Sequence, residues 1–150
     1  METDLQCPVD FVLINENKVR LIAFFVLVLT TVFLLTGLWI IIAFLIIDFF
    51  LRVNNWGKLS LLGILSDAII KQLHIKNKPV DRAPKRFAAG MGLIFTSGLL
   101  ALTLLHLPIA SMTVGVVLGF FAFLESIFGF CAGCRVYSIL GIISNSLKPK

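Results

Sequence analysis

The sequence predicts an all-α membrane protein with four transmembrane helices in two hairpins, together with one or two amphipathic helices that lie in the membrane interface. Hydrophobic residues make up 59% of its 150 residues, and the mean hydropathy is +1.02. A soluble domain is usually about 45–50% apolar, so the bilayer is the expected solvent. Two apolar runs, 19–51 and 87–130, are each about twice the roughly 20 residues that one membrane helix needs. We expect a single membrane domain over residues 1–150.

From residue 21 to residue 51, the first apolar run contains one charged residue, Asp48. Thr36 and Gly37 divide the run and predict a tight turn between two spans. One long tilted helix is the alternative interpretation, but it would split the basic residues of the chain between the two sides of the membrane. The spans predicted from the turn cover about residues 19–36 and 38–51.

The second apolar run is broken at Pro108. Proline lacks the amide hydrogen and clashes with the preceding turn, so it fits at the start of a helix better than inside one. This break predicts spans at about 87–107 and 109–130. Small residues follow one face of the fourth span and let a neighbouring helix approach closely: Ser111, Gly115, Gly119, Ala122 and Ser126. The neighbour can belong to the same chain or to a second copy, so a homo-oligomer is one expected assembly.

The basic residues determine the topology. All 13 lysines and arginines lie in three regions outside the predicted outer turns: 18–20, 52–86 and 135–150. With four spans, these regions share one face of the membrane. The positive-inside rule then places both termini and the central loop in the cytoplasm. This placement of the +5 net charge favours the lipid bilayer as partner, and we expect no nucleic acid.

Two segments outside the spans have apolar residues at helical spacing, which is typical of helices that lie in the interface. We expect these helices at about 59–75 and 131–147. The basic, proline-broken run 76–86 follows the first of them. Such a run either binds anionic headgroups, at about 1 kcal/mol per basic residue near the surface, or serves only as a topology signal.

The chemistry-bearing motif is a Cys-x-x-Cys, formed by Cys131 and Cys134 at the end of the fourth span. A helix that begins near Cys131 would place both sulfurs on one face, within disulfide reach. The positive end of that helix and the adjacent Arg135 would favour the reactive thiolate. Cys7, followed by Pro8, lies on the same face by the topology above. Three interpretations remain open: redox or persulfide exchange, a thiolate metal site, and buried cysteines without chemistry.

Two carboxylates lie within the predicted spans, where charge is costly and suggests function. Asp48 and Arg52 are four residues apart, so they can pair on one helical face. Glu125 would point about 120 degrees away from Cys131 along a continuous helix, which makes it a poor base for that thiol. We expect it instead to hold helices together through a basic partner. The candidates are Arg20, Arg52 and Arg86.

Other common sites are not indicated by the sequence. Neither His74 nor His106 has metal-ligand spacing to another candidate ligand. We find no glycine-rich phosphate loop and no nucleophile elbow. We therefore expect no cofactor, and a metal only if the cysteines themselves form the site.

Several stretches match a family pattern: Cys7-Pro8-Val9, 15–21, 48–52, 78–88, 124–126 and 129–134. In them the chain resembles the bacterial membrane proteins grouped as domain of unknown function 4395. The resemblance implies a small integral protein of the bacterial cytoplasmic membrane and supplies no activity. It also implies that Cys7 belongs to one pattern with Cys131 and Cys134.

The leading functional hypothesis is thiol-disulfide or persulfide exchange on the cytoplasmic side, with a soluble thioredoxin-like or sulfur-carrying partner. Cys131 would attack, Cys134 would resolve, and Cys7 would be a third thiol. The expected structural or modulating residues are Asp48, Arg52, Arg86, Glu125 and Arg135. One alternative is a non-catalytic membrane scaffold or small-solute permeation unit, in which the two carboxylates line an interior path or lock helices. The other is a thiolate metal site.

Overall fold

The computed structural model describes residues 13–129 and 132–146, but not the side chains of Asp81, Ala132, Cys134 and Asn145. Helices account for 81% of the described residues, which confirms the all-α prediction. The six helices are α1 (Glu16–Thr36), α2 (Trp39–Val53), α3 (Leu61–Gln72), α4 (Arg82–Leu104), α5 (Pro108–Phe128) and α6 (Ala132–Ser146). Two short strands, β1 (Leu13–Asn15) and β2 (Pro79–Asp81), pair antiparallel.

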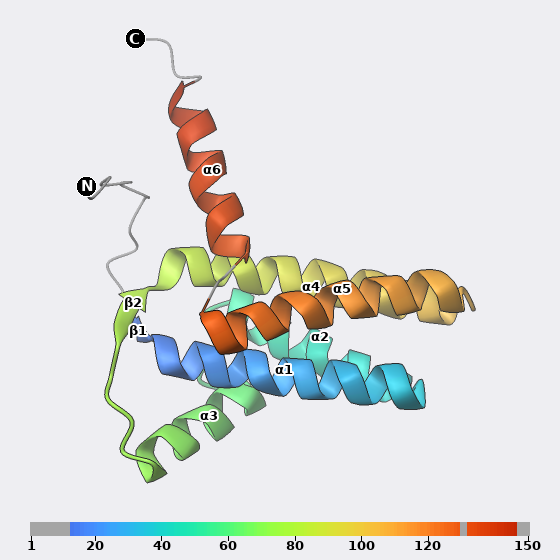
Figure 1. Ribbon diagram of the computed structural model, residues 1–150, viewed down its shortest axis with the longest axis horizontal. Helices are drawn as coiled ribbons and strands as arrows, with labels where there is room; N and C mark the ends of the chain where they lie inside the picture. Colours follow the sequence, from blue (N-terminus) through green and yellow to red (C-terminus); the bar gives the residue numbers. More distant parts are fainter. Residues whose placement is uncertain (1–12, 130–131, 147–150) are drawn as a thin grey trace.

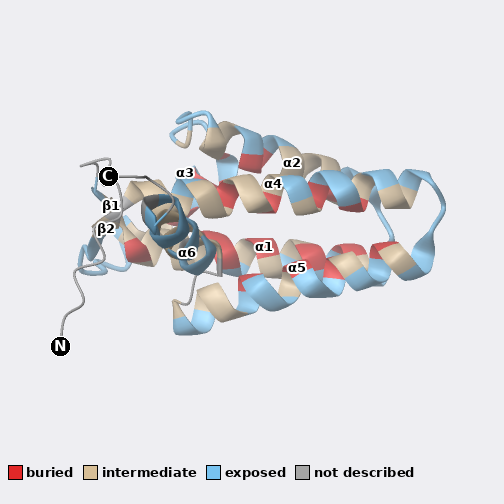
Figure 2. Ribbon diagram, turned by 90° about the horizontal axis from the view of Figure 1, so that it is seen from above, coloured by how far each residue is buried: buried red, intermediate tan, exposed pale blue. Residues whose placement is uncertain are grey.

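Four helices, α1, α2, α4 and α5, form an antiparallel bundle (Figure 1). Although α1 and α2 are consecutive, α1 packs chiefly against α5, and α2 packs chiefly against α4. Figure 2 shows these two pairs from above. Each helix of the first hairpin therefore has its main partner in the second hairpin, and the buried apolar core lies between them.

Local chemistry ends the bundle helices where the sequence predicts. Gly37 has a φ of 69°, a left-handed conformation that glycine adopts without steric cost, and its N–H donates to Phe33 O over 2.7 Å. Pro108 is the first residue of α5, where its missing N–H leaves no intrahelical hydrogen bond unmade. Both predicted breaks are confirmed.

The small residues of α5 face α1 of the same chain. A methyl group at Gly115 would lie 2.8 Å from Leu34 Cδ2, and one at Gly119 would lie 3.8 Å from Thr30 Cγ2. Ser111 and Ala122 on the same face are buried. The neighbour that the sequence left open is therefore α1, and the stripe supplies no argument for a second copy.

Three helices, α1, α4 and α5, are long and apolar enough to cross a membrane. α2 has 15 residues, which at 1.5 Å per residue is about 22 Å and shorter than the roughly 30 Å hydrocarbon core. The outward faces of the bundle are apolar and include Phe24, Ile94 and Phe120, each about half exposed or more. Such a surface indicates contact with lipid chains, as expected of a membrane protein.

α3 and α6 lie where the sequence predicts amphipathic helices. Both are found at the end of the bundle where α1 and α4 begin (Figure 1). α6 rises steeply from the bundle in Figure 1 and is seen almost along its axis in Figure 2. The β1–β2 ribbon occupies the same end, so among the described residues the helices and strands outside the four-helix bundle gather at this end.

Candidate functional site

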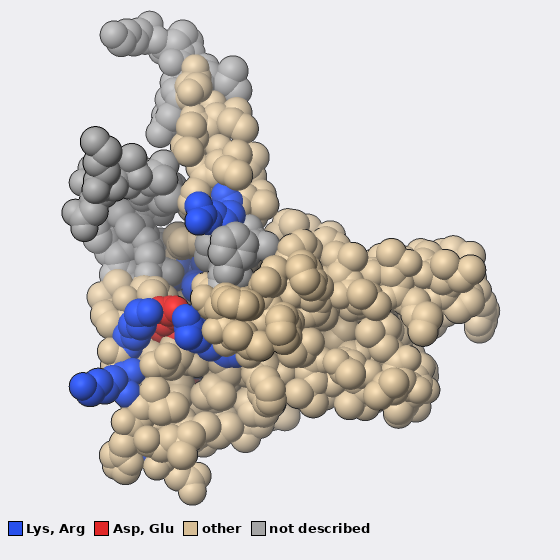
Figure 3. Space-filling model, viewed as in Figure 1, with Lys and Arg blue, Asp and Glu red and all other residues tan. Residues whose placement is uncertain are grey.

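Charged side chains gather at the end of the molecule that carries α3, α6 and the ribbon. In Figure 3, lysines and arginines appear only near this end, and the rest of the visible face of the bundle has neither sign of charge. The charged and polar side chains that could form a functional site therefore lie at this end of the bundle.

Asp48 is the centre of a buried polar cluster that joins α2 to α3. Its side chain is 1% exposed, and its Oδ2 lies 2.9 Å from Arg52 Nη2, so the predicted pair is present. Asp48 Oδ1 accepts a hydrogen bond from Ser60 Oγ over 2.5 Å and one from Leu62 N over 3.3 Å. Ser60 also caps α3, because its Oγ accepts from Gly63 N. The carboxylate thus fixes the start of α3 against α2.

Arg52 is held mainly by charge and by an aromatic ring. Its guanidinium lies 4.5 Å from the centroid of the Phe49 ring, in cation-π geometry. Its side chain is 17% exposed, and its Nε is buried without a hydrogen-bond partner among the described residues. Arg52 therefore retains capacity to donate to a further acceptor.

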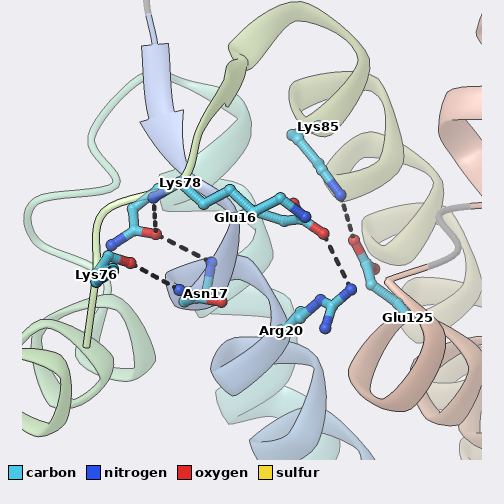
Figure 4. A network of polar contacts seen from close by, with 8 residues as sticks. Glu16, Asn17, Arg20, Lys76, Lys78, Lys85 and Glu125 are labelled. Atoms are coloured by element: carbon cyan, nitrogen blue, oxygen red, sulfur yellow. Dashed lines mark hydrogen bonds and ion pairs between the residues drawn. The ribbon is translucent and has the colours of Figure 1, made fainter. Parts of the chain in front are cut away.

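Glu125 joins α5 to α4, but through a partner that the sequence did not single out. Lys85 Nζ lies 3.3 Å from Glu125 Oε1 (Figure 4). Of the three expected arginines, Arg20 pairs with Glu16 over 3.1 Å, Arg86 donates to a backbone carbonyl at the end of α2, and Arg52 pairs with Asp48. Glu125 thus forms an ion pair between α5 and α4, but its partner is Lys85 and not one of the three arginines expected.

A second polar cluster ties the start of α1 to the segment before α4 (Figure 4). Lys78 Nζ lies 2.7 Å from Glu16 Oε2, and Glu16 N donates to Lys78 O over 2.8 Å. Asn17 Nδ2 donates to Lys76 O over 2.9 Å. Asn15 caps α1, since its Oδ1 accepts from Asn17 N. The sequence signal for this cluster was an asparagine followed by an acidic first-turn residue, which is typical of a helix start.

The thiol groups proposed as catalytic lie outside the described residues: Cys7 and Cys131 entirely, and Cys134 by its side chain. The structure does describe what brackets the motif. α5 ends at Phe128 and is capped by Gly129, whose φ of 63° is left-handed and whose Cα is covered by the guanidinium of Arg20. The described part of α6 begins at Ala132, next to the predicted start at residue 131. Arg135 lies in its first turn, with an exposed side chain.

Gly133, between the two cysteines, is in close contact with α4. A methyl group at this position would lie 2.7 Å from both Cα and Cβ of Ala88. One turn further along α6, the Tyr137 ring packs against Phe87 with centroids 5.5 Å apart. The backbone of α6 at Gly133 therefore packs directly on the first half of α4.

The start of α6 also lines a cavity of about 250 Å³, which lies at the end of the bundle where the charged side chains gather. The cavity is lined by residues of α1, α2, α4, α5 and α6, and most of them are apolar. Gly133 and Val136 are its lining residues from α6, and its charged lining residues are Arg52 and Glu125. The start of α6 therefore shares a cavity with one member of each ion pair, Arg52 of the Asp48 pair and Glu125 of the Lys85 pair. Among the side chains that the structure describes, no three of His, Cys, Asp and Glu converge on a metal position.

Comparisons with known proteins place the chain in a family. A search of curated proteins and a search of solved structures find no match. A family model, described as a domain of unknown function (DUF4395), matches residues 14–141 and thus most of the chain. The matched range includes the four bundle helices, Asp48, Glu125 and the Cys-x-x-Cys sequence at 131–134. The chain therefore belongs to the family of domain of unknown function 4395.

Proposed function

We propose that this is a four-span protein of the bacterial cytoplasmic membrane with both termini in the cytoplasm. Because β1 pairs with β2, the starts of α1 and α4 lie at the same end of the bundle. An even number of crossings is then needed between them, which favours α2 as a span despite its length. Local thinning of the bilayer can accommodate a short span. The collection of basic residues at this one end favours its cytoplasmic placement, with α3 and α6 as interfacial helices.

Cysteine labelling tests this topology. In a background with the three native cysteines replaced by serine, Leu105→Cys in the turn after α4 should react with a membrane-impermeant maleimide added outside spheroplasts. Asn77→Cys in the loop before β2 should react only after the membrane is opened. Both parent residues are exposed, so packing does not limit the reaction. The reverse pattern would overturn the orientation, and outside labelling of both would overturn the four-span arrangement.

We further propose that the protein exchanges thiols with a soluble thioredoxin-like or sulfur-carrying partner at this face. The observation that carries the proposal is the contact of Gly133 with Ala88, which places this residue between the two cysteines beside a cavity that Arg52 also lines. A nearby cation and a helix start both favour a thiolate. Glu125 lines the same cavity, but Lys85 offsets its charge.

The exchange proceeds in two displacements. The Cys131 thiolate attacks one sulfur of a disulfide in the partner, which forms a mixed disulfide and releases one partner thiolate. The Cys134 thiolate then attacks the Cys131 sulfur and releases the second partner thiolate. The partner gains two electrons, and the Cys131–Cys134 pair is oxidised to a disulfide. In the persulfide variant, Cys131 attacks the outer sulfur of a partner persulfide, becomes a persulfide itself and leaves the partner as a thiolate.

Trapping tests this chemistry. In nanodiscs, Cys134→Ser should accumulate a mixed disulfide with a thioredoxin variant that has a single active-site cysteine, supplied as a disulfide with a small thiol. The small thiol leaves, and neither the partner nor the Cys-x-x-Cys segment then has a second thiol to resolve the product. Cys131→Ser, which retains a cysteine in the same segment, should trap none. A persulfide donor should instead add one sulfur to Cys131, which mass spectrometry separates from disulfide formation. Cys7→Ser examines the third thiol in the same assay. If Cys134→Ser traps nothing and Cys131 acquires no sulfur, the proposal is wrong.

A scaffold function remains the second candidate, because the two intramembrane carboxylates are occupied in ion pairs. Asp48 fixes α3, and Glu125 joins α4 to α5. These contacts support the helix-locking part of the scaffold interpretation. On that interpretation, serine at all three cysteines would leave cellular function intact, whereas Glu125→Gln would impair it.

A further inference from the structure

A second cavity at the charged end, of about 340 Å³, lies between the start of α1, the end of α2, the loop after α2 and the start of α4. Its described lining contains no carboxylate. Six cationic side chains line it: Lys18, Arg52, Lys58, Arg82, Lys85 and Arg86. Its remaining lining includes Ile14, Val19, Ile22 and Ala89. The cavity thus has a strongly cationic part and an apolar part.

Three of the lining cations form ion pairs with acids that are not among the lining residues. Lys18 pairs with Asp67 over 2.6 Å, while Arg52 and Lys85 have Asp48 and Glu125 as partners. None of these three acids lines the cavity. Three of the cations are therefore paired with acids that do not themselves line the cavity.

Two lining cations have no carboxylate partner in the part of the chain that the structure describes. Arg86 donates its Nε to Val53 O over 2.8 Å, a neutral acceptor. Lys58 makes no hydrogen bond or ion pair with a described residue, and it is exposed in the loop after α2. Arg52 adds its buried, unpartnered Nε. Like charges that are brought together repel, so an anion in the cavity would relieve an unfavourable interaction.

We propose that this cavity binds a phosphate group. One arginine guanidinium can donate two parallel hydrogen bonds to the oxygens of one phosphate, and lysines add positive charge. The three arginines and three lysines of the lining therefore suit a phosphate better than a carboxylate. The cavity lies where α2 ends and α4 begins, which is the depth of phospholipid headgroups in the proposed topology. Its apolar part suits the glycerol end of an anionic phospholipid, and inorganic phosphate is the other source of the same group. The proposal is independent of the thiol chemistry.

Binding by the full chain in detergent or in nanodiscs tests the proposal. The variant Lys58→Gln, Arg86→Gln removes two lining charges, and Lys71→Gln, Lys76→Gln removes two charges outside the lining. We expect the first variant to bind phosphatidylglycerol at least about tenfold more weakly by native mass spectrometry, since tenfold corresponds to about one charge-assisted hydrogen bond. The second, with equal net charge, should bind as the unmodified protein does.

A titration with inorganic phosphate separates the two sources. If phosphate displaces the lipid, or raises the unfolding temperature in the unmodified protein and not in the first variant, the cavity takes the free ion as well. If only the lipid binds, the occupant is the headgroup. Equal weakening in both variants, or no saturable binding of either probe, would overturn the proposal. Should the double variant fail to fold, Lys58→Gln alone serves, because this side chain makes no described contact whose loss could disturb folding.

Discussion

Replacing Asp48 with asparagine is expected to lower the free energy of unfolding by about 3–5 kcal/mol, the usual cost of removing one partner from a buried ion pair. The change leaves the buried guanidinium of Arg52 without its counter-charge. It also weakens the hydrogen bonds from Ser60 Oγ and Leu62 N, which hold the start of α3. Chemical unfolding of the detergent-solubilised protein, followed by circular dichroism, measures the difference.

An exposed ion pair provides the control for this prediction. Lys18 and Asp67 are as close as 2.6 Å, but the Asp67 side chain is 48% exposed. Asp67→Asn should therefore cost no more than about 1 kcal/mol. The double variant Asp48→Asn, Arg52→Gln should recover part of the loss, because no unpaired charge remains buried. Equal effects of Asp48→Asn and Asp67→Asn would show that burial does not govern the Asp48 pair.

The helix ends of the bundle are predictable from the sequence because local residues mark them. Gly37 and Pro108 act within their own turns, so they need no tertiary contact to be recognised. The β1–β2 ribbon is different. Its strands have three residues each, too few to show a two-residue alternation, and one contains Pro79. Their pairing depends on the helices that bring Leu13–Asn15 and Pro79–Asp81 together.

Among the ion pairs, too, one is determined locally and another depends on tertiary packing. The Asp48–Arg52 pair follows from their spacing of four residues on one helix. The partner of Glu125 could be predicted only by knowing which face α4 turns towards α5. Lys85 and Arg86 are about 100 degrees apart on that helix, and only packing decides that Lys85 turns to α5 while Arg86 turns to the end of α2.

The contact between Asp48 and Ser60 and the two cavities could not be predicted from the sequence either. Ser60 meets Asp48 only because the seven residues between α2 and α3 fold back over the end of α2. The basic cavity collects side chains from positions 14 to 89, and no local pattern relates them. Composition could show that this face is basic, but not that six of its cations surround one space.

Gly133→Ala is expected to destabilise the docking of α6 on α4 by about 1–3 kcal/mol, the usual cost of overpacking a tight contact. The new methyl group would meet the Cα and Cβ of Ala88. Because a backbone atom cannot rotate away, α6 must shift as a whole. The contact between Phe87 and Tyr137 would be weakened with it. Limited proteolysis of α6 in nanodiscs should be faster in this variant, and thermal unfolding should begin at a lower temperature.

Gly141→Ala is the matched control, since it makes the same change two turns further along α6. There the new methyl group would lie more than 4 Å from any atom outside its own stretch of helix. It should stabilise the helix by about 0.5–1 kcal/mol, because alanine loses less backbone entropy than glycine. The two substitutions thus have effects of opposite sign on one helix. If the Gly133 contact also positions the proposed thiols, Gly133→Ala should slow exchange with thioredoxin while Gly141→Ala should not. Proteolysis accelerated by both variants would show instead that α6 is held by something other than its first turn.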